Sequence, residues 1–451
     1  MKLPAGAKLL TQTLSLSVGR VVGSGANFFA QLLLAHSMNV NDLGLFYIIT
    51  SIVIFLGAVA SIGYPGISNQ LMVRYVSRHQ DWKMKTFILT ARRDTLIIAL
   101  CVALAGVVAI TIGSDGDSRI IWPSVIAALA IPALTTLRVN GGIANALQRF
   151  ALSTLPDNLI RPVLFTLVIG ALVLMSMPLT LLNVVCAFSA LVIAIALTQT
   201  LIVGWSGGAA GRDRKPDRRE AKHWRKSGVY MLVPVLIIGL FADLVIIISG
   251  VLLESSQVAI FSICIKIAFM FGFFIQVLYQ ISLPRFTKAL RAKDQAGVAE
   301  LLTKINAVAV AMMIGALLAT WIAGRELLGV IGTQFQAGYS VLLILVAAQL
   351  IRALGGPALT LLIASGRHKL AIPPIAVSVA VFIAVAFALA PMLGTNGMAL
   401  AVVAAMTVSG IGLAVVVRRE LGFSCDALSR FKPGLPSISL IAGRLSERKL
   451  S

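Results

Sequence analysis

The sequence predicts an all-α integral membrane protein with about twelve transmembrane helices in two six-helix lobes. Its 451 residues are 58% hydrophobic and 12% charged, with a mean hydropathy of +0.95. A soluble domain has about a quarter of charged residues. A polar insertion also occurs twice, since Arg138-Val139-Asn140-Gly141-Gly142 and Arg352-Ala353-Leu354-Gly355-Gly356 both read Arg-x-x-Gly-Gly. Each falls in the fourth predicted helix of its half, so the chain is built from two like halves.

Apolar stretches long enough to cross a bilayer, which takes about 20 residues each, define the helices. They occur at 10–35, 44–73, 92–113, 120–147, 154–177, 179–204, 227–252, 257–284, 303–324, 337–364, 370–393 and 396–418. The predicted domains are a lobe at 1–206, a basic cytoplasmic linker at 207–226, a lobe at 227–420 and a basic cytoplasmic tail at 421–451.

The basic residues predict the topology, because Lys and Arg accumulate in cytoplasmic loops. Of the 38 Lys and Arg residues, only Arg119 and Arg325 fall in predicted external loops if the N-terminus is cytoplasmic. Both termini are then cytoplasmic. The net charge of +21 is explained by this cytoplasmic rim, which favours anionic lipid headgroups, and no nucleic acid partner is expected.

The two halves share their orientation, which predicts a parallel repeat about an axis along the membrane normal. Pro162 and the pair Pro373-Pro374 occupy similar places in the fifth helix of each half. The second helix of each half leaves through a basic exit, at Arg74 and at Arg285.

Cations outnumber acids inside the predicted helices. The cations are Arg20, Arg138, Arg161, Lys266 and Arg352, whereas only Asp157 and Asp243 are clearly internal acids. Buried charges are paired or hydrated. The excess therefore predicts a central water-filled cavity or an anionic ligand, and a pyrophosphate would supply the missing charge.

Two helices carry polar stripes that are expected to line this cavity. On the first helix, Thr13, Ser17, Arg20, Ser24, Asn27 and Gln31 recur every three or four residues, which places them on one face. On the eighth, Ser262, Lys266, Gln276 and Gln280 share a face. The predicted substrate-binding residues are Arg20, Asn27, Gln31, Arg138, Lys266, Gln276 and Arg352. Hydrogen bonding between helices is the alternative explanation of such stripes.

Four of the internal charges have simpler or different explanations. Arg138 and Arg352 could extend toward the cytoplasmic interface, and their Gly-Gly pairs would let another backbone approach or the helix bend. Arg161 follows Asp157 by four residues, which predicts an intrahelical ion pair. Asp243 has no basic residue within a helical turn, so it either carries a coupling proton or pairs across the cavity.

Cofactor and metal chemistry are not expected. The four cysteines and four histidines show no metal-ligand spacing, and the phosphate-binding pattern Gly-x-x-x-x-Gly-Lys-Ser/Thr is not present. Proton or sodium coupling is the expected energy source.

The chain resembles the multidrug/oligosaccharidyl-lipid/polysaccharide (MOP) exporter superfamily, nearest its polysaccharide-biosynthesis or Wzx-type flippase branch. The segments that carry the resemblance follow one another along residues 10–420. They are Asp42-Leu43-Gly44-Leu45-Phe46-Tyr47, Gly63-Tyr64-Pro65-Gly66, Ala146-Leu147-Gln148-Arg149-Phe150, Leu159-Ile160-Arg161-Pro162 and Leu283-Pro284-Arg285.

The resemblance implies two lobes around a V-shaped cavity. It also implies a flippase of the bacterial inner membrane that translocates undecaprenyl-pyrophosphate-linked oligosaccharide by alternating access, for lipopolysaccharide O-antigen, capsule or exopolysaccharide. A polymerase and other membrane proteins of that pathway are the expected partners.

Other classes fit less of the sequence. An ion-coupled multidrug antiporter would prefer internal carboxylates, and a lipid II flippase usually has extra C-terminal helices. A major-facilitator transporter would carry a different motif between its second and third helices. A membrane enzyme would need a large external loop with acids or histidines, so no enzymatic activity is expected.

The helix count predicts the result of a reporter fusion. A reporter fused after Ser206 should report a cytoplasmic location, because six helices precede it. Paired alkaline phosphatase and fluorescent protein fusions measure this, and a periplasmic signal would overturn the count.

Overall fold

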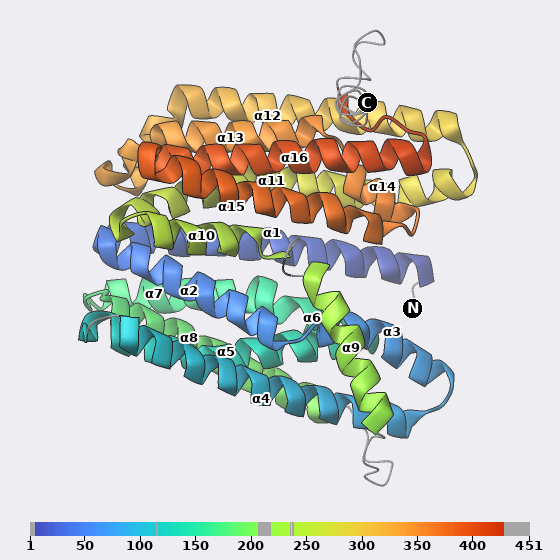
Figure 1. Ribbon diagram of the computed structural model, residues 1–451, viewed down its shortest axis with the longest axis horizontal. Helices are drawn as coiled ribbons and strands as arrows, with labels where there is room; N and C mark the ends of the chain where they lie inside the picture. Colours follow the sequence, from blue (N-terminus) through green and yellow to red (C-terminus); the bar gives the residue numbers. More distant parts are fainter. Residues whose placement is uncertain (1–4, 114–115, 206–217, 235, 237–238, 428–451) are drawn as a thin grey trace. The chain divides into compact units, whose positions relative to one another are not determined.

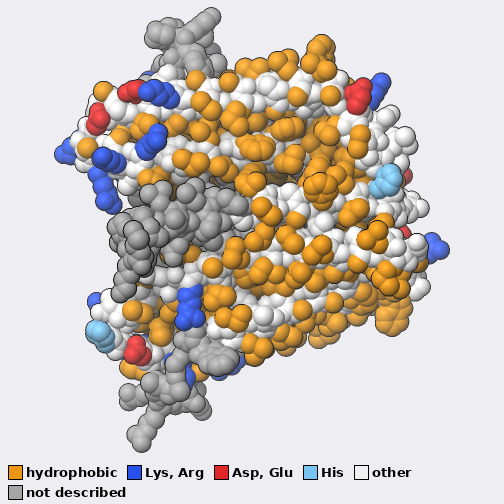
Figure 2. Space-filling view, turned by 180° about the vertical axis from the view of Figure 1, so that it is seen from behind, with side chains coloured by type: hydrophobic (Ala, Val, Ile, Leu, Met, Phe, Trp, Pro, Cys, Tyr) orange, Lys and Arg blue, Asp and Glu red, His pale blue; other side chains and the backbone are white. Residues whose placement is uncertain are grey.

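The computed structural model describes residues 5–113, 116–205, 218–234, 236 and 239–427, and these form two compact α-helical units. The units span Met1–Ile247 and Ile248–Ser451. Ten helices of the described residues are long and apolar enough to cross a membrane, so the prediction of an all-α, multi-pass membrane protein is confirmed. On the face shown in Figure 2, hydrophobic side chains cover much of the surface.

The first unit is drawn from blue to light green in Figure 1. Its helices are α1 (Ala5–Ser37), α2 (Val40–Ala60), α3 (Tyr64–Ser77), α4 (Asp81–Gly113), α5 (Ser118–Ala146), α6 (Phe150–Leu155), α7 (Arg161–Leu174), α8 (Leu181–Trp205) and α9 (Arg218–Pro234). A π-helical turn, η1 (Pro156–Ile160), joins α6 to α7, and α10 (Phe241–Leu252) crosses the boundary between the units.

The second unit has a similar succession of helices. It contains α11 (Ser255–Arg291), α12 (Gln295–Ile331), α13 (Tyr339–Leu354), α14 (Ala358–Ala364), α15 (Ile372–Leu393) and α16 (Thr395–Leu421). The short helical turns η3 (Thr333–Gly338) and η4 (His368–Ala371) precede α13 and α15.

The packing inside each unit follows one scheme. In the first unit α5 packs against α2, α4 and α8, and in the second unit α13 packs against α11, α12 and α16. In predicted helix order, the fourth helix of each half thus contacts the second, third and sixth helices of that half. This common scheme is what an internal repeat produces.

Several predicted helices are interrupted rather than continuous. The predicted span 44–73 breaks between α2 and α3, where Ile62 and Gly63 have φ of 46° and 65°. The span 227–252 consists of α9 and α10, and 337–364 breaks between α13 and α14 at Gly356, which has φ of 72°. A left-handed glycine followed by proline ends a helix readily.

The predicted linker is partly helical. Residues 206–217 and most of the tail, 428–451, lie outside the described residues. Residues 218–226, which the sequence assigns to the linker, begin α9. The domain boundaries at 206, 226 and 420 stay predictions.

The two Gly-Gly pairs allow close approach of a second backbone, as the sequence predicts. A Cβ on Gly142 would lie 2.5 Å from the Cα of Pro65 in α3. A Cβ on Gly356 would collide with the backbone oxygen of Cys425. The first pair lies inside the continuous helix α5, whereas the second pair separates α13 from α14. The helix bends only at the second motif.

Substituting Gly142 with alanine should therefore destabilise the first unit. Overpacking costs about 1–3 kcal/mol, because α3 and α5 must move apart to admit the methyl group. Gly106 of α4 is the matched control, since a Cβ there meets nothing within 4 Å. Thermal unfolding in detergent should show a loss for Gly142→Ala and no loss for Gly106→Ala. Equal melting temperatures would contradict the close contact.

Candidate substrate-binding cavity

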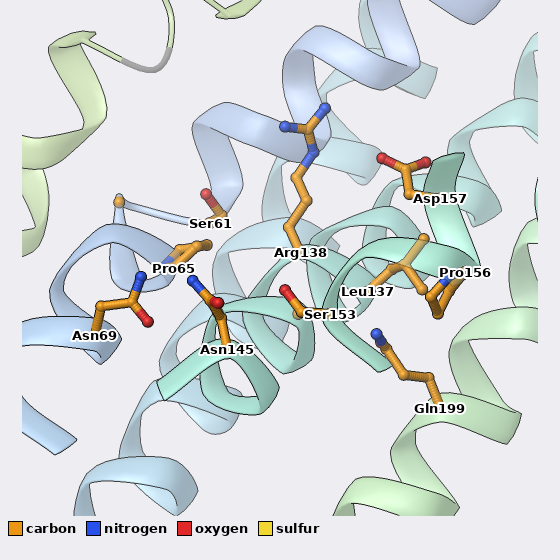
Figure 3. Close-up of a pocket in the computed structure, with 13 residues that line it drawn as sticks. Ser61, Pro65, Asn69, Leu137, Arg138, Asn145, Ser153, Pro156, Asp157 and Gln199 are labelled. Atoms are coloured by element: carbon orange, nitrogen blue, oxygen red, sulfur yellow. The ribbon is translucent and has the colours of Figure 1, made fainter. Parts of the chain in front are cut away.

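A cavity of about 290 Å³ lies in the first unit, beside the break between α2 and α3. Its lining comes from the turn between α2 and α3 and from α3, α5, α6, η1 and α8, and it is mostly polar or small. The lining residues are Ser61, Gly63, Pro65, Asn69, Leu137, Arg138, Gly141, Gly142, Asn145, Ser153, Pro156, Asp157 and Gln199. Figure 3 shows these side chains converging from different helices.

The first Arg-x-x-Gly-Gly motif forms one wall of this cavity. Arg138, Gly141 and Gly142 all line it. Gly142 lies against Pro65, and a Cβ on Gly141 would lie 3.3 Å from the backbone oxygen of Ser153. The glycines thus let α3 and α6 approach α5, and the side chain of Arg138, from the same motif, extends toward the level of Asp157 (Figure 3).

Asp157 faces Arg138 from the π-helical turn. Figure 3 shows the carboxylate and the guanidinium on the same side of the cavity. The Nε and Nη2 atoms of Arg161 both lie 2.9 Å from Oδ1 of Asp157, so the predicted i, i+4 ion pair is confirmed. Pro156 has no N–H to donate at this point of the helix, and single π-helical turns are frequent at functional sites.

Arg138 is the least satisfied charge in this cavity. Its Nε atom is buried and has no hydrogen-bond partner among the described residues. The charges of Asp157, Asp243 and Arg161 all act on it. The lining itself holds one guanidinium, that of Arg138, and one carboxylate, that of Asp157, and the excess of cations over the whole chain stays a prediction.

A second polar network lies behind the motif, and the sequence did not predict it. Nε of Arg92 donates to Oδ1 of Asn140 at 3.0 Å, and Nδ2 of Asn140 donates to Oγ1 of Thr200 at 2.8 Å. These bonds tie α4 and α8 to α5. Asn140 is one of the variable positions of the motif, so a single sequence gave no signal for its role.

The polar stripe of α1 is only partly described. Asn27 is exposed, and Gln31 donates to it at 3.5 Å. Thr166 of α7 donates to the backbone oxygen of Ala26 at 2.7 Å, and α1 packs against α7 and η1. The backbone of Arg20 is helical, but its side chain lies outside the described residues.

The remaining predicted residues lie in the second unit. Lys266 is half-buried and Gln276 is exposed on α11, whereas Ser262 of the same stripe is fully buried. Arg352 of α13 donates through Nη2 to the backbone oxygen of Gly272 at 3.1 Å. The second motif thus bonds α13 to α11. A single central cavity that joins these residues to Arg138 stays a prediction.

Arg138 and Arg161 should respond differently to an apolar substitution. Arg138→Met removes a buried cation whose Nε has no partner among the described residues, so the loss of thermal stability in detergent should be smaller than for Arg161→Met. Arg161→Met leaves Asp157 without its ion pair and should cost about 1 kcal/mol, since the pair is part-exposed. Equal losses for both variants would show that Arg138 is a structural cation.

The fold is known from solved structures, although no protein-family model and no curated protein sequence matches the chain. The inward-facing form of a multidrug resistance MATE family transporter of the MOP superfamily has a TM-score of 0.69 and 12% identity, over 90% of this chain and 98% of that one. The lipid II flippase MurJ, inward closed, has a TM-score of 0.72 and 12% identity, over 90% and 87%. A MOP superfamily transporter from Pyrococcus furiosus Vc1 has a TM-score of 0.63 and 13% identity, over 96% and 100%. The chain therefore has the fold of these transporters.

Proposed function

We propose that the protein is a flippase for an undecaprenyl-pyrophosphate-linked oligosaccharide, working by alternating access in the bacterial inner membrane. The observation that carries the proposal is Arg138, whose buried Nε has no partner among the described residues and which lines a polar cavity. A guanidinium binds phosphate oxygens through two parallel hydrogen bonds. The likeness to solved transporters, one of them a lipid II flippase, supports the same class.

The cavity is large enough for the first part of a lipid-linked glycan but not for the whole glycan. Its volume of about 290 Å³ is at the lower end of small-molecule pockets, at about 300 Å³. Asn69, Asn145 and Ser153 offer donors and acceptors for sugar hydroxyl groups. Oε1 of Gln199 is buried and has no partner among the described residues, so it is available to accept one such bond. The pyrophosphate and the first sugar would bind here.

The other predicted cations would extend the path of the substrate. Arg20, Lys266 and Arg352, with Asn27, Gln31 and Gln276, are proposed to line the route that the pyrophosphate and its glycan follow. A polymerase or another membrane protein of the same pathway would receive the product.

Asp243 would couple transport to an ion. Its charge acts on Arg138, so the substrate and Asp243 interact with the same guanidinium. The coupling ion is proposed to bind at Asp243, so that binding of the anionic lipid at Arg138 and binding of the ion influence each other.

A multidrug antiporter is the second candidate. The carboxylate of Asp157 lines the cavity, where it could attract a cationic drug, and a MATE family transporter has the same fold. The pairing of Asp157 with Arg161 makes this less favourable, because the carboxylate already has a cation.

A transport assay in proteoliposomes tests the proposal. A labelled undecaprenyl-pyrophosphate disaccharide should flip, measured by loss of protection from a membrane-impermeant quencher. Arg138→Ala should lower the rate at least tenfold, roughly 1.4 kcal/mol or more, and Arg138→Lys should retain part of it. Arg149→Ala is the matched control, because Arg149 is exposed just beyond the same helix.

In cells, Arg20→Ala or Lys266→Ala should abolish surface polysaccharide while the protein level is unchanged. Normal export by both variants would contradict the cationic path. Efflux of a cationic dye in place of lipid transport would favour the antiporter.

A further inference from the structure

We propose that the outer face of α9 is a binding site for anionic phospholipid headgroups. The inner face of this helix packs against other helices of the first unit. Ala221, Trp224 and Gly228 are buried, and Nε1 of Trp224 donates to the hydroxyl of Tyr75 in α3 at 3.0 Å. The indole also packs edge-on against Phe87 of α4. α9 runs across α3 and α4 rather than along them (Figure 1).

Ion pairs fix both flanks of α9. On one side, Nε and Nη2 of Arg225 lie 2.7 Å and 3.1 Å from the two carboxylate oxygens of Asp94 in α4. The buried Asp94 also accepts a bond from Tyr64 at 3.2 Å. This pairing raises the pKa of the Arg225 guanidinium. On the other side, Nζ of Lys83 lies 2.7 Å from Oε1 of Glu220.

The outer face of α9 carries basic residues along its first turns and an aromatic residue further toward its C-terminus. At 100° per residue, Arg219, Lys222, His223, Lys226 and Tyr230 fall within an arc of about 100°, and all five are exposed. Among the described residues, the acids that contact the flanks of α9 are Glu220 and Asp94. They are bound to Lys83 and Arg225 and lie outside this arc. The outer face is therefore cationic without an acidic residue of α9 among its members.

Exposed apolar residues of the neighbouring helix α4 indicate how deep the outer face of α9 lies relative to a membrane. Just beyond Asp94, the side chains of Leu96, Ile97, Leu100 and Leu104 are 44%, 53%, 54% and 67% exposed. In a membrane-spanning helix such residues face hydrocarbon. The Arg225–Asp94 pair thus lies at the edge of the hydrocarbon, and the basic arc of α9 lies at the level of lipid phosphates. Tyr230, 67% exposed, follows where interfacial aromatic residues gather.

The headgroup site therefore belongs to a helix that is already immobilised by protein contacts. Its apolar face is packed on α3 and α4, so the helix does not insert as a free amphipathic helix does. Binding rests on the electrostatic attraction of the exposed side chains of Lys222 and Lys226 to phosphate groups.

Lipid photo-crosslinking of the purified full-length protein tests the site. A photoactivatable phosphatidylglycerol should label peptides of α9, and a zwitterionic phosphatidylcholine probe should not. Each basic residue near a membrane surface contributes about 1 kcal/mol, or about fivefold in affinity. In the double variant Lys222→Gln, Lys226→Gln, the concentration of unlabelled phosphatidylglycerol that halves the labelling should therefore rise about 25-fold.

Arg291→Gln with Lys293→Gln is the matched control, because both side chains are exposed and lie on the second unit. This pair should leave labelling of α9 unchanged. Equal labelling by both lipids, or labelling unaffected in the α9 variant, would overturn the site. The measurement does not depend on transport, so it stands or fails separately from the flippase proposal.

Discussion

The contact between α3 and α5 at Pro65 and Gly142 is the packing on which the first unit depends. It is possible only because Gly142 has no side chain, and it brings the beginning of α3 against the last residue of the polar motif. The cavity is bounded by these same residues. The glycine that permits the contact and the arginine that gives the cavity its charge lie one helical turn apart, so structure and chemistry are specified by one short segment.

Much of the fold could be predicted because hydrocarbon imposes a simple rule on the sequence. Every backbone polar group must be bonded within the segment, so long apolar stretches form helices, and the repeat of Arg-x-x-Gly-Gly locates the two halves. The breaks at Ile62 and Gly356 were less visible. Hydropathy averages over a turn or more and does not register one residue with a left-handed backbone.

The site could be predicted only in part, since pairing across helices leaves no local pattern. Asp157 and Arg161 share one helix, and their spacing revealed the ion pair. Arg92, Asn140 and Thr200 come from three helices, so only the folded chain shows that they meet. The two motif arginines also differ. Arg352 bonds a backbone oxygen, whereas Arg138 retains an unpartnered nitrogen among the described residues.

The attachment of α9 also changes where the chain divides into its two units. By sequence this helix follows the linker and opens the second half, yet Trp224 and Arg225 bind it to α3 and α4, and the first unit extends to Ile247. The predicted linker at 207–226 therefore ends in a helix that packs within the first unit. By packing, the chain divides within α10, between Ile247 and Ile248, and not at the linker.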